Sequence, residues 1–187
     1  MALALLIMKT KENGIKRKEI KMKKALIVID MQEATIGANH ANFFKYENEL
    51  LKRVNGIIKN TDAAIVVYIK NLMKNNLINK LAPVKVFENS PEAELAKDLL
   101  IVSDNIFSKY TGDAFSNTDF CNFLKNNSID TVELIGVDGG GCVSLTALGA
   151  CENNYKVILN TSAIGTMFET KKDKYFDKLR RLGAEFV

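Results

Sequence analysis

The sequence predicts an α/β protein in which a mainly parallel sheet carries helices on both of its faces. Three observations support this fold class: short apolar runs rich in β-branched residues, longer segments with apolar residues at helical spacing, and the alternation of these two kinds of segment along the chain. Such alternation is typical of βαβ units, in which a helix connects two parallel strands. The 187 residues are enough for one domain with a sizeable core.

The first half of the chain begins this alternation. Residues 25–29 (ALIVI) form a continuous apolar run, which is typical of a strand buried on both faces. Residues 46–59 place five apolar residues at helical spacing, and residues 63–69 (AAIVVYI) form a second buried strand. After a polar, irregular segment, Ser90-Pro91 has the form of a helix start, with Ser90 as N-cap and proline in the first turn.

The second half continues the pattern. Strands are expected over 105–108, 131–137, 155–160 and 184–187. Helices are expected over 117–126, 141–152 and 171–182. Asn117 or Thr118 is expected to cap the first of these helices, because Asn and Thr accept hydrogen bonds from free N–H groups at helix starts.

Charge is unevenly distributed along the chain. Residues 1–24 hold eight Lys/Arg and two Glu, so +6, whereas residues 25–187 hold eighteen Lys/Arg and twenty Asp/Glu, so −2. The basic stretch lacks the layout of a secretory signal and the interleaved aromatic residues of a nucleic-acid-binding arm. We expect residues 1–22 to be a poorly ordered extension and residues 23–187 to form the single domain; the alternative is that translation begins at Met22.

Several classes of protein are excluded by composition. No apolar run approaches the roughly 18–20 residues that span a bilayer, so no membrane association is expected. Three cysteines without a C-x-x-C spacing argue against a disulfide framework and a zinc site. The single histidine, His40, argues against a histidine-based metal site. We expect a cytoplasmic protein with no cofactor and no nucleic-acid partner.

Three chemically reactive side chains stand where strands are expected to end. In open α/β sheets, ligands bind beyond the carboxyl ends of the strands, and Asp30, Lys109 and Cys142 fall at such ends. A thiolate is a nucleophile, which a nearby lysine and a helix N-terminus both favour by lowering the cysteine's pKa. A carboxylate can take the thiol proton and pass it to a leaving amine. Together these residues indicate covalent catalysis by Cys142.

The loop before Cys142 fits this chemistry. Residues 138–141 (DGGG) can turn tightly and present backbone N–H groups to a developing oxyanion. Taken singly, each feature has a simpler reading. Asp30 could cap a loop, Lys109 could be solvated, Cys142 could be a small buried apolar residue, and the glycines could cradle a phosphate. Neither G-x-x-x-x-G-K-[ST] nor a G-x-G-x-x-G after the first strand is present, however.

Three blocks of sequence resemble the isochorismatase-like cysteine hydrolases, which include nicotinamidases and N-carbamoylsarcosine amidase. They are 25–32 (ALIVIDMQ), 109–115 (KYTGDAF) followed by Thr118, and 136–143 (GVDGGGCV) followed by Thr146-Ala147. The resemblance covers residues 24–187. It implies a Rossmann-like, three-layer α/β/α sandwich with a six-stranded, mainly parallel sheet, and a homo-oligomer, either a dimer or a tetramer.

The resemblance also implies roles for individual residues. Cys142 would attack a small amide-type substrate to form a thioester, Asp30 would be the general base, and Lys109 would stabilise the site. A cis peptide bond would join Val137 to Asp138, and the oxyanion hole would be the N–H groups of Asp138 and Cys142. The residues expected to contact substrate are Gln32, Phe115 and Val137.

Departures from the family pattern bear on the residues of the pocket and on the type of reaction. Glu33-Ala34-Thr35 replaces the Asp-Phe that commonly follows the Gln, so Phe43 or Phe44 is expected to supply the missing ring. Residues 60–80 contain no His, which argues against a metal-dependent nicotinamidase, and Cys142 argues against vinyl-ether hydrolysis. Two alternatives stay open: a non-catalytic small-molecule-binding protein with the same fold, and a nucleotide-binding protein that uses the 138–141 loop.

Overall fold

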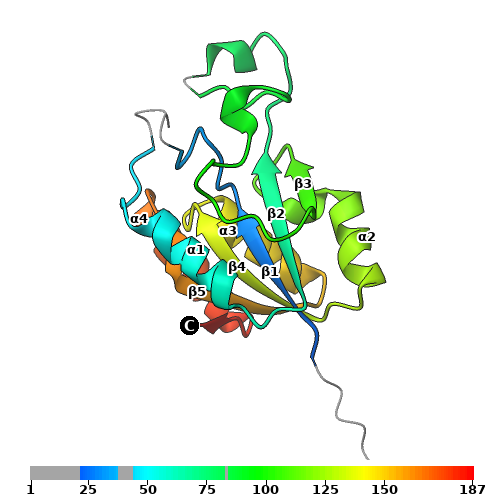
Figure 1. Cartoon of the computed structure of the whole chain (residues 1–187). Coiled ribbons are helices and arrows are strands. Elements are labelled where there is room, and N and C mark those ends of the chain that lie inside the picture. Colours follow the sequence, from blue (N-terminus) through cyan, green and yellow to red (C-terminus); the bar gives the residue numbers. More distant parts are fainter. Residues whose placement is uncertain (1–21, 38–43, 83) are drawn as a thin grey trace, which may run out of the picture.

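Six parallel strands form one sheet in the order β3-β2-β1-β4-β5-β6. The computed structural model describes residues 22–37, 44–82 and 84–187 (Figure 1). The strands are β1 Lys24–Ile29, β2 Ile65–Asn71, β3 Ile106–Lys109, β4 Thr131–Val137, β5 Lys156–Gly165 and β6 Glu185–Phe186. The predicted six-stranded sheet is therefore confirmed, and every pairing in it is parallel.

Four α-helices cover the two faces of the sheet. They are α1 Leu50–Asn60, α2 Thr118–Asn126, α3 Cys142–Glu152 and α4 Glu169–Arg181. Leu26 and Val28 of β1 belong to the core cluster that contains the buried side chains of α1. Ile27 and Ile29 belong to the cluster that contains those of α2, α3 and α4. Because successive side chains of a strand point to opposite faces, β1 is buried between both helical layers, as predicted.

Two elements differ from their sequence-based predictions. The helix expected from residue 46 begins at Leu50, and residues 44–47 before it have no regular secondary structure. The helix start at Ser90 gives only a 3-10 turn, Pro91–Ala93, without a side-chain cap from Ser90. The reason is tertiary: the carbonyls of Glu92 and Glu94 accept hydrogen bonds from a segment that follows β1, so they are not available to a helix.

The other expected elements are present, some with different bounds. Asn117 caps α2, because its side chain accepts a hydrogen bond of 3.0 Å from the N–H of Phe120. The last helix begins at Glu169, two residues before its expected start, and β5 continues to Gly165, five residues beyond its expected end. This longer β5 brings the segment that follows it to the same edge of the sheet as the end of β4.

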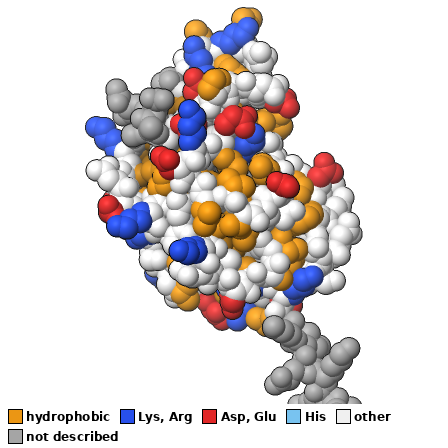
Figure 2. Space-filling view, viewed as in Figure 1, with side chains coloured by type: hydrophobic (Ala, Val, Ile, Leu, Met, Phe, Trp, Pro, Cys, Tyr) orange, Lys and Arg blue, Asp and Glu red, His pale blue; other side chains and the backbone are white. Residues whose placement is uncertain are grey.

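The segment that follows β2, residues 72–82 and 84–93, projects beyond the edge of the sheet at which the strands end (Figure 1). It is called the projecting segment below. Hydrophobic side chains reach the surface on the projection and on the face below it (Figure 2). The exposed ones on the projection are Leu77, Ile78 and Leu81. The expectations about residues 1–21, His40 and Phe43 concern positions outside the described residues. Within the described ranges, no helix combines the length and the apolar character that crossing a membrane requires.

Candidate active site

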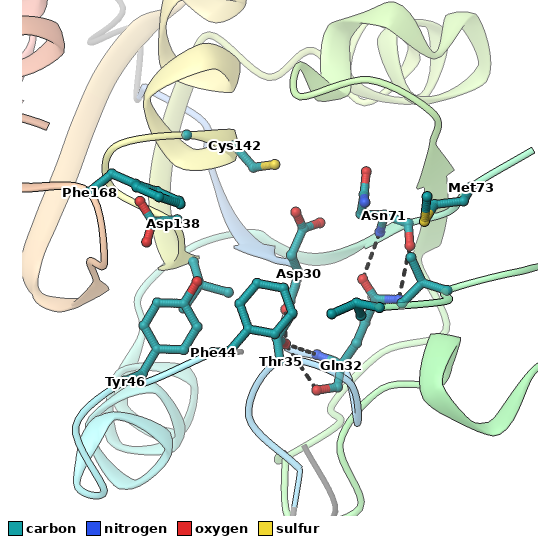
Figure 3. A pocket seen from close by; sticks show the side chains of 14 residues that line it. Asp30, Gln32, Thr35, Phe44, Tyr46, Asn71, Met73, Asp138, Cys142 and Phe168 are labelled. Carbon is teal, nitrogen blue, oxygen red and sulfur yellow. Dashed lines mark hydrogen bonds between the residues drawn. The ribbon is translucent and has the colours of Figure 1, made fainter. Parts of the chain in front are cut away.

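The carboxyl ends of three strands bring Asp30, Lys109 and Cys142 together. Asp30 follows β1, Lys109 ends β3, and Cys142 begins α3 after the loop that follows β4. The Lys109 Nζ lies 2.9 Å from Asp30 Oδ2 and 3.2 Å from Cys142 Sγ. The side chains of Asp30 and Cys142 face the same space (Figure 3). The convergence expected from the sequence is therefore present.

Lys109 is a buried ammonium surrounded by acceptors. Only 1% of the residue is exposed, and Nζ also donates to Asn71 Oδ1 and to the Thr111 carbonyl, each at 3.2 Å. Burial lowers the pKa of Lys109, but the charges of Asp30 and Cys142 outweigh burial, so the net pKa is raised. Lys109 is accordingly a cation at neutral pH.

Asp30 keeps one oxygen available at the centre of the site. Its Oδ2 is bound by Lys109, whereas its buried Oδ1 has no hydrogen-bond partner among the described residues. The backbone of Asp30 has φ 54°, in the left-handed region, and its N–H donates to the Ile69 carbonyl. Asp is among the few residues other than glycine that adopt this conformation readily. The turn aims a carboxylate with a free lone pair at the space beside Cys142.

The pKa of the Cys142 thiol is raised, whereas the nearby lysine and the helix start were expected to lower it. Burial, and then the carboxylate of Asp30, raise the pKa of Cys142 to about 12, and Lys109 lowers it only in part. The physical reason is that Lys109 already neutralises Asp30, so little of its charge is left to offset the loss of water. Deprotonation of the sulfur therefore needs a base in the site.

The loop between β4 and α3 leaves two N–H groups uncommitted. The Val137–Asp138 peptide bond is cis, as the resemblance implied. Of the six N–H groups over residues 138–143, four are bonded within the protein. They belong to Gly139, Gly140, Gly141 and Val143, and they donate to Gly165 O, to Asp138 Oδ1 and, twice, to Asp138 O. The N–H groups of Asp138 and Cys142 donate to no acceptor in the part of the chain that the structure describes.

Glycine is required in this loop because another segment passes close to it. A Cβ atom on Gly140 would lie 2.4 Å from the Phe168 carbonyl oxygen. A Cβ atom on Gly139 would lie 2.5 Å from Thr166 Oγ1. The glycines thus permit the chain after β5 to pack against the loop, in addition to the tight turn that the sequence indicated.

A mainly apolar cavity of about 280 Å³ opens above Cys142. Aromatic rings of Phe44, Tyr46 and Phe168 form one wall (Figure 3). Aliphatic side chains from the projecting segment, Met73, Val84 and Val86, contribute to the rest. Asp30 and Cys142 also line the cavity, so the reactive groups are accessible to a small molecule.

The three residues expected to contact substrate have different positions. Gln32 and Val137 line the cavity. The Gln32 amide is engaged elsewhere, because it bonds both the N–H and the carbonyl of Asn71 and also the carbonyl of Ala93. The structure places Phe115 away from the cavity, in the core, where its ring centroid lies 5.2 Å from that of Phe120. The mostly polar residues around Phe115 in the sequence did not distinguish a core position from a cavity wall.

Several lining residues were not anticipated. Phe44 was one of two expected rings, and the other, Phe43, lies outside the described residues. Tyr46 was assigned to a helix, and Phe168 stood in a segment without a recognisable pattern. Val84 and Val86 gave no signal, because their place depends on how the projecting segment folds back. No group of three or more His, Cys, Asp or Glu side chains in the described ranges is arranged to hold a metal ion.

Solved structures with this fold include several amidases and hydrolases. An isochorismatase-like hydrolase from Alkaliphilus metalliredigens superposes with a TM-score of 0.73 at 24% identity, over 88% of this chain and 93% of that one. N-carbamoylsarcosine amidase from Thermoplasma acidophilum gives 0.72 at 24% identity, over 88% and 95%. Pyrazinamidase of Pyrococcus horikoshii, solved with zinc, gives 0.74 at 23% identity, over 88% and 98%. At these identities the comparison establishes the shared fold.

Sequence comparison assigns the family. The probable hydrolase YcaC of Escherichia coli (strain K12) is 29% identical over 104 residues, which are 54% of this chain and 50% of YcaC. The chain thus matches about half the length of this curated relative. The family described as the isochorismatase domain matches residues 24–187, which is nearly the whole chain. The chain therefore belongs to the isochorismatase domain family.

Proposed function

We propose that this protein is an amidohydrolase that cleaves a C–N bond of a small amide-type substrate through a thioester on Cys142. The observation that carries the proposal is the position of one buried ammonium, on Lys109, within 3.2 Å of both the Asp30 carboxylate and the Cys142 sulfur. An acid, a cation and a thiol in contact at the floor of an accessible cavity form a complete set for nucleophilic catalysis.

In the first half of the reaction, the substrate carbonyl carbon lies above Cys142 Sγ. Asp30 Oδ1 takes the thiol proton as sulfur attacks, and the negative charge on the carbonyl oxygen is met by the N–H groups of Asp138 and Cys142. The C–N bond then breaks, and the amine leaves with the proton that Asp30 held. The acyl group stays on sulfur as a thioester.

In the second half, water enters beside Asp30, which takes one of its protons. The hydroxide adds to the thioester carbonyl, the C–S bond breaks, and sulfur regains the proton from Asp30. A thiol with a raised pKa fits this scheme, because the same carboxylate takes the thiol proton as sulfur attacks and later returns it. Lys109 stays charged throughout and stabilises both anionic partners.

A non-catalytic small-molecule-binding protein is the second candidate, and the raised pKa of Cys142 favours it. The free lone pair on Asp30 favours catalysis over this alternative, because it supplies the base that the thiol needs. Nucleotide binding by the 138–141 loop is less well supported. Most N–H groups of the loop are already bonded, and two carboxylates, of Asp30 and Asp138, line the cavity.

The test is a screen for release of amine over nicotinamide, carbamoylated amines, ureido compounds and hydroxamates. The wild type is compared with Cys142→Ala and with Cys151→Ala, which removes a cysteine outside the cavity. We expect turnover in the wild type and in Cys151→Ala, none in Cys142→Ala, and an acyl adduct on Cys142 by mass spectrometry. Turnover by Cys142→Ala contradicts the mechanism, and binding of an amide without turnover by the wild type supports the second candidate.

A further inference from the structure

The side chain of Asp138 connects separate segments around the cavity. Its Oδ1 accepts a hydrogen bond of 2.6 Å from the N–H of Gly140, in the loop before Cys142. Its Oδ2 accepts one of 2.6 Å from the N–H of Met167, in the segment between β5 and α4. Both contacts are short, as hydrogen bonds to a carboxylate are. One buried carboxylate therefore fastens the nucleophile loop to the chain that follows β5.

Tyr46 brings a third segment to the same carboxyl group. Its hydroxyl points toward Asp138 from the chain that precedes α1 (Figure 3). Burial, and then the charge of Asp138, raise the pKa of Tyr46, so its hydroxyl stays protonated and can donate. Burial also raises the pKa of Asp138, while the N–H groups of Met167 and Gly140 lower it. The carboxylate is thus held by donors that replace water.

These contacts bear on catalysis through the backbone of the same residue. The N–H of Asp138 is one of the two uncommitted N–H groups at the cavity, and its direction follows from where the Asp138 Cα is held. Met167 directly precedes Phe168, whose ring lines the cavity, as does that of Tyr46. The Asp138 carboxylate therefore sets the position of an N–H donor relative to two of the aromatic rings that line the cavity.

We propose that Asp138 is a positioning residue: its side chain aims its own N–H into the oxyanion hole and fixes that donor relative to the rings of Tyr46 and Phe168. This inference rests on the proposed function, since an oxyanion hole has a role only in acyl transfer. A bare carboxylate so close to a developing oxyanion would oppose it. Here both oxygens are occupied by donors, which spreads the charge away from the cavity.

The decisive variant is Asp138→Asn, which keeps the shape of the side chain. One carboxylate oxygen becomes an NH2 group that must face the N–H of either Gly140 or Met167, so two donors oppose each other. The matched control is Asp113→Asn. Asp113, which is half-buried, also accepts a backbone N–H with its carboxylate, that of Phe115 at 2.8 Å, but it does not line the cavity.

Two readouts separate positioning from a general structural role. The first is kcat and KM on the amide that turns over best in the screen. The second is the rate at which iodoacetamide alkylates Cys142 at pH 9, followed by peptide mass spectrometry. Alkylation occurs at a saturated carbon and forms no oxyanion, so it reports whether the thiol and its neighbours are intact without using the oxyanion hole.

We expect Asp138→Asn to lower kcat by at least about tenfold, because loss of one oxyanion donor costs about 10²–10³ in kcat. KM and the alkylation rate are expected to change by less than about threefold, as for an interaction made in the transition state alone. Asp113→Asn should keep kcat within about threefold of the wild type. If Asp138→Asn does not fold, Asp138→Ser, which keeps one acceptor, gives the same comparison.

Three outcomes overturn the inference. The first is an unchanged kcat in the Asp138 variant. The second is an equal loss of kcat in Asp113→Asn, which would make the effect one of general stability. The third is a parallel fall of kcat and alkylation rate, which would mean that the whole site has collapsed. If the wild type itself turns over no amide, the proposed function fails and this inference fails with it, whereas the first two outcomes leave the proposed function standing.

Discussion

The side-chain amide of Gln32 pairs with the backbone of Asn71 as a neighbouring strand would. The Asn71 N–H donates to Gln32 Oε1 at 2.7 Å, and Gln32 Nε2 donates to the Asn71 carbonyl at 3.1 Å. This pairing fixes the end of β2 beside the turn that follows β1. Because Asn71 Oδ1 in turn accepts from Lys109, the amide of Gln32 supports the ammonium at the centre of the site without touching it.

We predict that Gln32→Glu lowers both stability and turnover. A carboxylate cannot donate to the carbonyls of Asn71 and Ala93, so a buried repulsion replaces two hydrogen bonds, at about 1–3 kcal/mol. The resulting displacement of Asn71 is expected to lower kcat by at least about tenfold. Thermal unfolding and steady-state kinetics measure the two effects.

The control for this prediction is Asn55→Asp. Asn55 also bridges backbone groups, the Asp98 carbonyl and the Leu100 N–H, but on α1 and outside the cavity. It should lose stability and retain its kcat. If both variants lose kcat equally, Gln32 has no specific relation to the site.

Lys109→Met should be strongly destabilising and inactive. Removing the ammonium leaves the buried Asp30 carboxylate unpaired, which costs about 3–5 kcal/mol. Because the folded pKa of Lys109 is raised, its contribution is fully present below the unfolded value of about 10.4 and is lost only as pH rises through the folded pKa. Urea titrations measure the unfolding free energies of wild type and variant. We expect their difference to stay constant between pH 6 and about pH 9, as far as Lys109 determines it.

The control is Lys70→Met, which breaks the exposed pair with Glu94. This variant should cost under about 1 kcal/mol.

Alkylation of Cys142 by iodoacetamide should accelerate steadily with pH. Since the thiol pKa is about 12, the thiolate fraction increases about tenfold per pH unit from pH 7 to pH 10. Peptide mass spectrometry distinguishes Cys142 from Cys121 and Cys151, which are also free thiols. A plateau below pH 8 would show instead that Lys109 and the start of α3 outweigh burial.

Gly136→Ala is predicted to disrupt the centre of the sheet. Gly136 has φ 109°, and a Cβ atom there would lie 2.2 Å from the backbone oxygen of Ile29. Left-handed strain and overpacking together should cost at least about 2 kcal/mol in chemical denaturation. Gly56→Ala is the control, because its Cβ would meet nothing within 4 Å in α1 and should stabilise the helix by about 0.5–1 kcal/mol. Equal stability of the two variants would contradict this reading.

Local patterns predicted the parts of the fold in which each segment's own chemistry decides the outcome. The run 25–29 is apolar on both faces, and it forms the buried strand β1. Asn117 caps α2 because its side chain reaches an N–H three residues away. The Ser90-Pro91 signal failed since backbone groups of residues 33 and 34 take the nearby carbonyls, and that competition is invisible within the segment.

The same distinction applies to the site. Asp30, Lys109 and Cys142 were predictable because strand ends in a parallel sheet meet at one edge. The residues of the cavity walls were not predictable. Val84 and Val86 face the cavity only because the projecting segment folds back on itself, with the Met73 N–H bonded to the Val86 carbonyl. Phe115 illustrates the converse: a ring close in sequence to Lys109 points into the core, between Phe120 and Tyr155.

The strand order makes side-chain length a requirement at position 109. Lys109 ends the outermost strand β3, and β2 lies between it and β1, so two strand spacings of together about 9–10 Å separate it from the strand that Asp30 follows. The four-carbon stem of lysine carries Nζ over the end of β2, where it meets Asn71, and the side chain of Asp30 covers the rest of the gap. An ammonium on a stem one carbon shorter, such as that of ornithine, would preserve the charge but lie farther from both the carboxylate and the sulfur.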